Sequence, residues 1–329
     1  MAVLLVSHRL HAERSADLAR HAAEAGLEVV ALPEDREGRL PDDVIARIEI
    51  AFFSGDVFPD FSRQFFSAVR KAPNLKWLHV FNVGVDHPIY TEMLERGVRL
   101  TTSAGSTAEP IAQTAITALL MLARNWPRWL TAQREHRWNP MRTADFPPDL
   151  RGQTAVIVGL GHIGTEIARL AQVLGLNVIG VRRSPREPGD PVDEMHTPDK
   201  LAGLLPRADW LILACPLTDE TRGLVDAALL AQLPKTARLL NIGRGEVVDE
   251  PALIDALRSG SLAGAYLDVF QQEPLAPESP LWDLPNVFVT PHNSNSAAGN
   301  DARIYDIFID NLSRWRKGAP LANEISRGQ

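Results

Sequence analysis

Three residues in the second half of the chain have side chains that together suit the reduction of a keto acid: Arg244, Glu273 and His292. A histidine can give a proton to a forming alkoxide near neutral pH, and a nearby carboxylate orients the ring and favours its charged form. An arginine can hold a substrate carboxylate with two hydrogen bonds and polarise the ketone beside it. The three residue types therefore predict hydride transfer to a keto acid.

Each of these residues also has a simpler interpretation. A histidine beyond a strand is often structural, and Glu273 before a proline could be a solvated loop acid. Arg244 is harder to explain in this way, because the glycines on either side give it room but no packing role. All three follow predicted strands, and ligands of open α/β sheets bind beyond the carboxyl ends of strands. The combination therefore indicates one crevice next to a nicotinamide.

A glycine-rich turn, GLGHIG at residues 159–164, precedes these residues in the chain. Gly159, Gly161 and Gly164 have the G-x-G-x-x-G spacing. The first glycine permits a tight turn, the second lets the backbone approach a pyrophosphate, and the third lets helix and strand pack closely. A helix beginning near His162 would point free N–H groups at the phosphates. A similar turn without a nucleotide is the alternative, but the apolar run before it and the amphipathic segment after it favour dinucleotide binding.

Arg182, Arg183 and Ser184 stand at the end of the next predicted strand, where the adenosine ribose of a dinucleotide is expected. A carboxylate at this place would accept hydrogen bonds from the 2′-hydroxyl and repel a 2′-phosphate. Two guanidinium groups reverse both effects, since they form charge-assisted hydrogen bonds with phosphate, and the serine adds a hydroxyl. The alternative is a solvated basic loop. Between the two, we favour NADP(H) over NAD(H) as the cofactor.

The elements that must position these residues form two series of short apolar runs separated by segments with helical periodicity. This alternation predicts an α/β protein with two doubly wound domains, each a parallel sheet covered by helices. We also expect a long, largely buried helix over 108–125, a loop over 139–153, and a final helix over 297–317 that packs back on the first domain. The predicted strands lie at residues 3–6, 27–32, 50–55, 75–81, 98–102, 154–159, 177–181, 210–215, 237–243, 262–270 and 286–291.

Length and composition limit the remaining possibilities. The chain has 329 residues, of which 45% are hydrophobic and 23% charged, as in soluble globular proteins. The net charge of −7 argues against a general attraction to nucleic acid or to an anionic membrane. Cys215 is the only cysteine, so neither an intramolecular disulfide nor a cysteine metal cluster can form. No apolar run has the length of a membrane span and the N-terminus lacks a basic segment, so we expect a cytoplasmic protein without a metal site.

Six stretches of the sequence carry a resemblance to a known family: GLGHIG (159–164), CPLTDETRGL (215–224), LLNIGRGEVVDEPAL (239–253), GAYLDVFQQEPL (264–275), VTPHNS (289–294) and NLSRWRKGAPLANEI (311–325). Over nearly its whole length the chain resembles the D-isomer-specific 2-hydroxyacid dehydrogenase family, and within it the NADP-dependent glyoxylate/hydroxypyruvate reductases. The resemblance implies a flavodoxin-like, substrate-binding domain formed by residues 1–102 and 294–329, and a Rossmann-like dinucleotide-binding domain formed by residues 103–293. The family is usually dimeric, with the helix near 108–125 and the following loop in the contact, so a homodimer is expected.

The resemblance also implies a role for each residue on the substrate side of the candidate site. His292 would be the acid and base, Glu273 its partner, and Arg244 the anchor of the substrate carboxylate and carbonyl. Val83 and Gly84 lie in FNVGVDH, which is similar to a loop that binds the substrate carboxylate through backbone N–H groups.

On the cofactor side, the resemblance matches Asp268 with the residue that holds the nicotinamide amide. Cys215, Pro216 and Thr221 match the adenine and pyrophosphate side. His292 is also expected to contact the nicotinamide. The other positions expected at the cofactor lie in the glycine-rich turn and just before Arg244: His162, Ile163, Asn241, Ile242 and Gly243.

Three functions remain open at this point. The first is reduction of glyoxylate, hydroxypyruvate or a similar small 2-keto acid to the D-2-hydroxy acid with NADPH. The second is oxidation or reduction of a larger 2-hydroxy acid, such as a phenylpyruvate-like or branched compound, or of 3-phosphoglycerate, with NAD. The third, from another class, is a dinucleotide-sensing protein that acts as a corepressor by binding a protein partner. We expect the first, because the arginine pair resembles the NADP-using reductases.

Overall fold

The computed structural model describes residues 1–85 and 87–325, which fold into two compact units. Met1–Ser106 and the C-terminal segment from Ala297 form the first unit, and Thr107–Ser296 form the second. The sequence placed the first boundary after residue 102. The structure places it later, because the turn after the last strand closes within the first unit, where the Ser106 N–H donates to the Ser103 carbonyl at 3.0 Å.

The first unit contains a five-stranded sheet in which all strands are parallel. Its order, β2-β1-β3-β4-β5, is that of a flavodoxin-like domain. The three central strands of this order are mainly apolar and mostly buried, as expected for a parallel sheet covered by helices, whereas β2 at one edge is largely only partly buried. The strands are β1 (Ala2–Val6), β2 (Leu27–Ala31), β3 (Ile48–Phe53), β4 (Trp77–Val80) and β5 (Arg99–Thr102).

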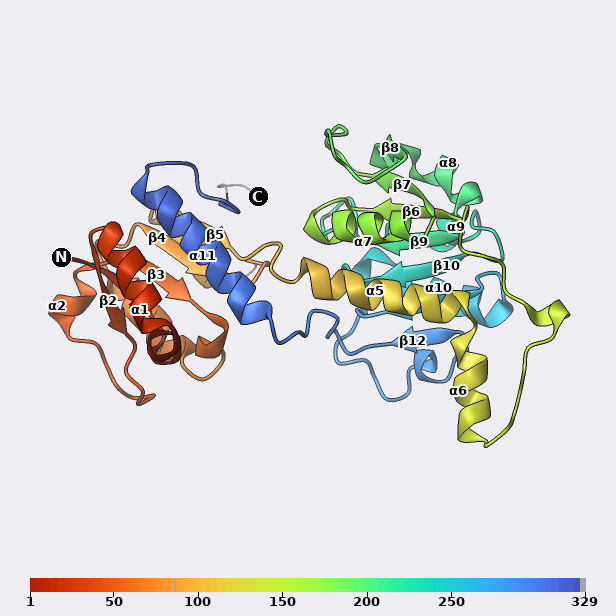
Figure 1. The fold of residues 1–329 in the computed structure, drawn as a ribbon, viewed down its shortest axis with the longest axis horizontal. Helices are drawn as coiled ribbons and strands as arrows, with labels where there is room; N and C mark the ends of the chain where they lie inside the picture. Colours follow the sequence, from red (N-terminus) through yellow and green to blue (C-terminus); the bar gives the residue numbers. More distant parts are fainter. Residues whose placement is uncertain (86, 326–329) are drawn as a thin grey trace. The chain divides into compact units, whose positions relative to one another are not determined.

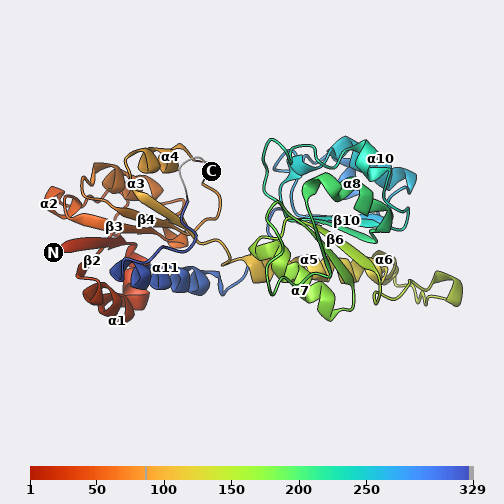
Figure 2. The same cartoon turned by 90° about the horizontal axis from the view of Figure 1, so that it is seen from above.

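Helices cover both faces of this sheet (Figures 1 and 2). One face is covered by α1 (His8–Glu24) and by α11 (Asn300–Arg316), the last helix of the chain. The ring of Phe308 in α11 stacks on Phe52 with a centroid distance of 4.3 Å, so a distant part of the sequence completes this core. The opposite face is covered by α2 (Asp42–Ile45), α3 (Ser62–Lys71) and α4 (Pro88–Glu95).

The second unit contains a seven-stranded parallel sheet in the order β12-β11-β10-β9-β6-β7-β8. Read from β8, the first six strands follow the Rossmann order, and the order reverses between β6 and β9. Together the two sheets confirm the predicted fold class. The strands are β6 (Thr154–Val158), β7 (Asn177–Val181), β8 (Glu194–His196), β9 (Trp210–Leu213), β10 (Arg238–Asn241), β11 (Gly264–Leu267) and β12 (Val287–Val289).

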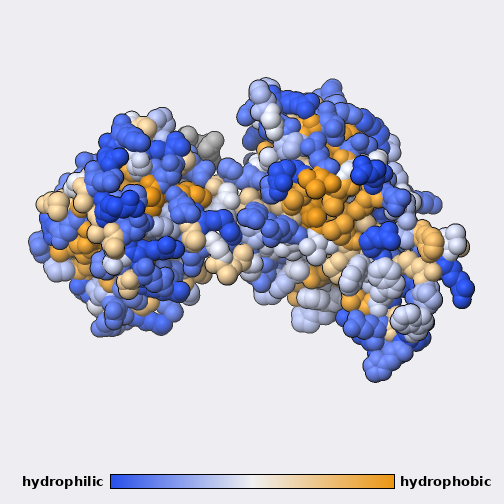
Figure 3. Space-filling model, in the orientation of Figure 1, coloured by the Kyte–Doolittle hydropathy of each residue, from blue (hydrophilic) through white to orange (hydrophobic). Residues whose placement is uncertain are grey.

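The helices of the second unit again lie on both faces of its sheet. One face carries α5 (Ala108–Ala123) and α7 (His162–Val173), which pack on each other, and apolar side chains reach the surface of this unit (Figure 3). The other face carries α8 (Leu201–Leu204), α9 (Ala227–Leu230) and α10 (Glu250–Ser259). Single 3₁₀ turns lie at Gly55–Val57, Thr143–Asp145, Pro198–Lys200, Leu205–Arg207, Gly245–Val247 and Pro280–Trp282.

Two elements were missed by the sequence analysis. The predicted helix over 108–125 ends at Ala123, because Asn125 adopts a left-handed conformation with φ of 54° and starts a new direction. The helix that follows is α6 (Trp126–Arg134). Strand β8 has only three residues, all partly buried, and therefore lacks the apolar run that identifies the other strands.

None of the helices in the described residues has both the length and the apolar character that crossing a membrane requires.

Candidate active site

Arg244, Glu273 and His292 lie beyond the carboxyl ends of three strands that are neighbours in the second sheet. They follow β10, β11 and β12 respectively, and the last residues of these strands pair with one another across the sheet. Because the strands are parallel and in register, all three residues follow strand ends at the same edge of the sheet. This is the edge at which doubly wound sheets bind ligands.

His292 and Glu273 form a direct pair. The Nδ1 atom of His292 is 2.7 Å from Oε2 of Glu273, and Oε1 of Glu273 accepts the backbone N–H of Phe270 at 3.1 Å. Both side chains are partly exposed, at 46% for His292 and 36% for Glu273. Since the carboxylate accepts from Nδ1, the Nε2 atom of the imidazole is left to meet a ligand.

The backbone at His292 is held in an unusual conformation by Asp268. His292 has a φ of 50°, which a residue other than glycine rarely adopts. Its N–H donates to the Asp268 carbonyl at 2.8 Å. The Asp268 carboxylate is 2% exposed and accepts from the Thr290 hydroxyl at 2.5 Å, from the Asn293 N–H at 2.9 Å, and from both the N–H and the hydroxyl of Ser294. Asp268 therefore fixes the segment that carries the histidine.

Arg244 is exposed at the end of a tightly packed turn. Its guanidinium donates to the Gly243 carbonyl at 2.8 Å, and the buried Asn241 side chain donates to the Arg244 carbonyl and accepts the Gly243 N–H. A Cβ on Gly243 would lie 2.7 Å from the Cys215 oxygen, and one on Gly245 would lie 1.9 Å from the Phe270 carbonyl carbon. The flanking glycines are thus required by close backbone packing, which holds the arginine in place.

The glycine-rich turn lies at the point where the strand order reverses, between β6 and β9. Gly159 has a φ of 94°, and a Cβ there would lie 2.6 Å from Cys215 Cα. A Cβ on Gly164 would lie 1.9 Å from the Gly159 oxygen. At Gly161, in contrast, a Cβ would meet no atom of the described residues within 4 Å. This glycine has no packing requirement within the chain, and the open space beside it fits the approach of a pyrophosphate to the start of α7.

The first turn of α7 and the segment after β9 surround this glycine-rich turn. His162 is exposed and Ile163 partly exposed, while Ile242, which follows β10, is buried. Cys215 is buried, and this burial raises the pKa of its thiol. The Thr221 hydroxyl donates to the carbonyl of the exposed Pro216 at 2.7 Å, so Thr221 closes a compact turn beside Cys215.

The two arginines after β7 differ in their surroundings. Arg182 is 12% exposed and forms two hydrogen bonds with the Asp190 carboxylate, at 3.1 and 2.7 Å, and its Nε donates to the Ser184 carbonyl. The backbone N–H of Glu187 and these bonds lower the pKa of Asp190. Arg183 is exposed, and no hydrogen-bond or ion-pair partner is found for it within the described residues. The pair predicted from sequence is therefore divided: Arg182 holds its own loop, and Arg183 and the Ser184 hydroxyl face solvent.

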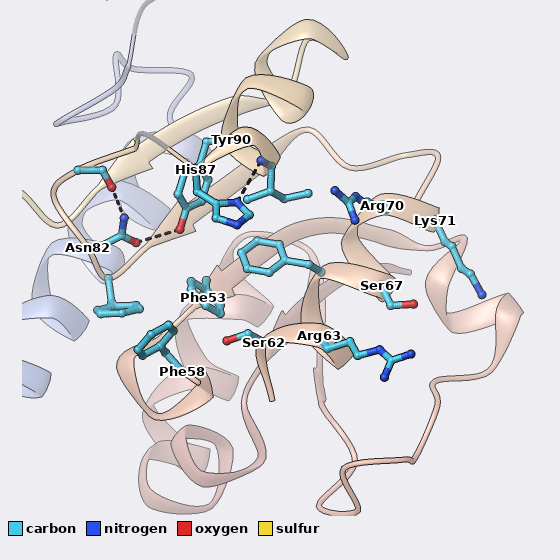
Figure 4. Close-up of a pocket in the computed structure, with 14 residues that line it drawn as sticks. Phe53, Phe58, Ser62, Arg63, Ser67, Arg70, Lys71, Asn82, His87 and Tyr90 are labelled. Carbon is cyan, nitrogen blue, oxygen red and sulfur yellow. Dashed lines mark hydrogen bonds between the residues drawn. The ribbon is translucent and has the colours of Figure 1, made fainter. Parts of the chain in front are cut away.

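Val83 and Gly84 belong to the first unit, in the loop after β4. Val83 is 50% exposed and Gly84 is exposed. The Asn82 side chain donates to the Gly84 carbonyl and accepts the Tyr90 hydroxyl at 3.1 Å. Asn82 therefore ties this exposed loop to α4, which carries Tyr90 (Figure 4).

The sequence analysis missed the residues that hold the site in shape. Sequence analysis assigned no role to Asp190 or Ser294, and their hydrogen bonds with Arg182 and Asp268 became evident only in the structure. A weak signal exists for Asp190, because it follows Gly189, whose φ of 97° makes the turn that brings the carboxylate back to Arg182.

Comparison with known proteins identifies relatives of this chain. The model of the D-isomer specific 2-hydroxyacid dehydrogenase, NAD binding domain, matches residues 116–294. A glyoxylate reductase from Korarchaeum cryptofilum is 35% identical over 266 residues, which cover 78% of this chain and 77% of that protein. The residues matched by the family model include the glycine-rich turn, Arg244, Glu273 and His292.

Two solved structures resemble nearly the whole chain. A D-isomer specific 2-hydroxyacid dehydrogenase from Xanthobacter autotrophicus, in complex with NADPH and MES, has a TM-score of 0.75 and 31% identity and covers 99% of this chain and 98% of its own. An NADPH-dependent glyoxylate/hydroxypyruvate reductase from Sinorhizobium meliloti, in complex with NADP and sulfate, has a TM-score of 0.73 and 28% identity with the same coverage. From its sequence, its two sheets and these likenesses, the chain belongs to the D-isomer specific 2-hydroxyacid dehydrogenase family of NAD(P)-dependent oxidoreductases.

Proposed function

We propose that this dehydrogenase reduces a 2-keto acid to the D-2-hydroxy acid with NADPH, and that glyoxylate and hydroxypyruvate are the first substrates to test. The observation that carries the proposal is the pair of His292 and Glu273, 2.7 Å apart at the edge of the second sheet where Arg244 also follows a strand. A histidine with a carboxylate partner is suited to proton transfer, and the arginine to binding a carboxylate.

In this proposal His292 gives a proton to the carbonyl oxygen of the substrate from Nε2. Glu273 accepts a hydrogen bond from Nδ1 and so holds the ring in the orientation and protonation state that the transfer needs. When bound, the reduced nicotinamide supplies the hydride that forms the new C–H bond at the keto carbon. Asp268 keeps His292 in place through the segment that follows β12, and it is also assigned to the nicotinamide amide.

Arg244 is assigned to the substrate carboxylate and to the polarised carbonyl, because its guanidinium is exposed and keeps donors free beyond its bond to Gly243. The exposed loop of Val83 and Gly84, which is similar to a carboxylate-binding loop of the family, is assigned to substrate binding. By these assignments the first unit contributes to substrate binding, and the second unit, which contains residues that match the NAD binding domain, binds the cofactor.

The preference for NADPH is assigned to Arg183 and Ser184. Both are exposed after β7, and they keep their side-chain donors free for a 2′-phosphate, whereas Arg182 is committed to Asp190. The two solved relatives described above were determined with NADPH or NADP, which supports the same preference.

We also propose that the protein is a homodimer. The segment after α5 exposes Trp126, Trp129 and Trp138, and Trp138 is 96% exposed in the single chain. Large exposed aromatic side chains in one region are typical of a surface that is covered in an assembly. Sedimentation velocity of the wild type and of Trp138→Ser tests this: we expect a dimer that the variant weakens, and a wild type that stays monomeric at all concentrations would contradict it.

The direct test of the proposed reaction is the initial rate of NADPH or NADH oxidation, followed by absorbance, with glyoxylate and with hydroxypyruvate. We expect NADPH to be preferred about tenfold or more, the effect of one charge-assisted hydrogen bond. Equal rates with NADH would remove the assignment of Arg183 while leaving the reductase in place. No oxidation of either cofactor with any 2-keto acid would refute the proposed function.

A further inference from the structure

Tyr266 links the hydrophobic core of the second unit to the segment that carries His292. It is the next-to-last residue of β11, and 1% of its surface is exposed. Its side chain packs in the core that α5 and α7 cover. Its hydroxyl lies 2.8 Å from the hydroxyl of Thr290, in the segment after β12. A buried residue is therefore in contact with the chain two residues before His292.

Thr290 lies between the side chains of Tyr266 and Asp268. These two residues are two positions apart at the end of β11, and side chains with this spacing point to the same side of a strand. The Thr290 hydroxyl contacts both, at 2.8 Å from the phenol and 2.5 Å from the carboxylate. The Thr290 N–H donates to the Leu267 carbonyl at 3.0 Å, which fixes the backbone between the two contacts. The three side chains therefore form one row of hydrogen bonds.

The donors and acceptors in this row fix its direction. A carboxylate only accepts, so the single hydroxyl hydrogen of Thr290 goes to Asp268. Tyr266 must then donate to Thr290. Burial raises the pKa of Tyr266 to about 12, so the phenol keeps the proton that it donates near neutral pH. The hydroxyl of Thr290 is thus held in one orientation by a donor on one side and an acceptor on the other.

The backbone around His292 depends on this orientation. Its φ of 50° is strained for a residue other than glycine and needs support from both sides. After His292, the Asn293 N–H donates to the Asp268 carboxylate at 2.9 Å. Before it, Pro291 has no N–H to donate, so the Thr290 hydroxyl makes the contact with this carboxylate. Loosening that hydroxyl lets the strained backbone relax and moves the imidazole.

We propose that Tyr266 is a positioning residue, which keeps the imidazole of His292 in place through its hydrogen bond to Thr290. This role rests on the proposed function, in which His292 gives the proton, and the buried phenol takes no part in the chemistry itself. Tyr266→Phe keeps the ring in the core and removes the donor. We expect kcat to fall about tenfold, the effect of one buried hydrogen bond, while NADPH still binds.

A double-mutant cycle in kcat, with NADPH and glyoxylate or hydroxypyruvate, tests whether Tyr266 acts through Thr290. It compares the wild type, Tyr266→Phe, Thr290→Val and the double variant. Adding Tyr266→Phe to Thr290→Val should cost no further activity, because the hydroxyl through which the phenol acts is already gone. Thr290→Ser keeps a hydroxyl and should restore most of the kcat that Thr290→Val loses.

Tyr305→Phe is the matched control. Tyr305 is 4% exposed, and its hydroxyl donates to the Asp17 carboxylate at 2.8 Å in the first unit. This variant also removes a buried phenol hydroxyl, so its melting temperature should fall, but its kcat should stay at the wild-type value. Hydrogen exchange followed by mass spectrometry gives a second measurement that needs no activity. The peptide that contains His292 should exchange faster in Tyr266→Phe than in the wild type or in Tyr305→Phe.

A wild-type kcat in Tyr266→Phe would overturn the positioning role and leave the reductase in place, and so would losses that multiply in the double variant. If Tyr266→Phe fails to fold, as judged by its melting temperature and NADPH binding, equal kcat values in Thr290→Val and Thr290→Ser would overturn it. A wild type that reduces no 2-keto acid would refute the proposed function. Hydrogen exchange then decides, and an unchanged rate in Tyr266→Phe would refute this inference as well.

Discussion

Glu273 holds the imidazole of His292 at Nδ1, with 2.7 Å between the two atoms, while its second oxygen is held by the Phe270 backbone. A carboxylate fixed at both oxygens cannot swing away from the ring. The ring orientation is therefore set by the chain itself, and Nε2 is the nitrogen left for proton transfer.

Replacing His292 should separate turnover from cofactor binding. His292→Asn removes the proton donor, and general acid catalysis contributes about 10²–10⁴-fold to the rate. We expect kcat to fall by that factor while the Kd for NADPH stays unchanged, as measured by steady-state kinetics and by fluorescence titration of NADPH. Turnover within a few-fold of the wild type would show that another group gives the proton.

The two arginines after β7 should respond differently to replacement. Arg183→Ala removes a free cation, so we expect the KM for NADPH to rise about ten- to hundredfold and the KM for NADH to stay near its original value. Arg182→Ala leaves the Asp190 carboxylate without its ion pair, so we expect a lower melting temperature. Kinetics with both cofactors and thermal unfolding check the two effects. A larger loss of NADPH affinity in Arg182→Ala would reverse the assignment.

Two glycines of the same turn should also behave differently. Gly161→Ala adds a methyl group to open space, so we expect a normal melting temperature and weaker NADPH binding. Gly164→Ala places its methyl group 1.9 Å from the Gly159 oxygen, so we expect a lower melting temperature. Any loss of NADPH binding in this variant is then a consequence of the disturbed fold. Thermal unfolding and NADPH titration of both variants distinguish the two. Unchanged NADPH affinity in Gly161→Ala would argue that no pyrophosphate approaches this glycine.

His79 should make the stability of the first unit depend on pH. It is buried between the hydroxyls of Thr101 and Ser103, and burial lowers its pKa from 6.5 to about 3. Because the folded pKa is below the unfolded value, the unfolded state binds more protons between these values. The free energy of unfolding then falls as the pH drops below about 6.5, by at most about 1.4 kcal/mol per pH unit.

His79→Gln provides the control for this effect, because glutamine can hydrogen-bond but does not titrate. Denaturant unfolding at about pH 7 and about pH 5 should show a larger loss of stability in the wild type than in the variant. The same loss in both proteins would mean that other groups cause the pH dependence.

The sequence predicted the parts of the molecule that depend on local pattern. The strands of both sheets, except β8, fall in the apolar runs, and Arg244 and His292 could be placed because each follows such a run. The interactions that hold the site could not be predicted in this way. Asp268 and Ser294 come from different strand ends and meet only after the sheet has formed, and no periodicity in the sequence encodes their contact.

The different surroundings of the two arginines after β7 could not be predicted for the same reason. From the sequence, Arg182 and Arg183 looked equivalent because they are adjacent and of the same type. In the structure, the turn at Gly189 brings the Asp190 carboxylate into contact with Arg182 but not with Arg183. The roles proposed for Arg183 and His292 are predictions that the replacements described above test.

The packing of α11 on the first sheet has a consequence for the order in which the chain is made. Phe308 covers Phe52 and Trp77, yet it leaves the ribosome only after the whole of the second unit has been synthesised. The second unit is continuous in sequence and can complete its fold on the nascent chain. Until α11 emerges, α1 alone covers this face and the rings of Phe52 and Trp77 lack their partner, so the stage of synthesis just before release is the one most open to chaperone binding or aggregation.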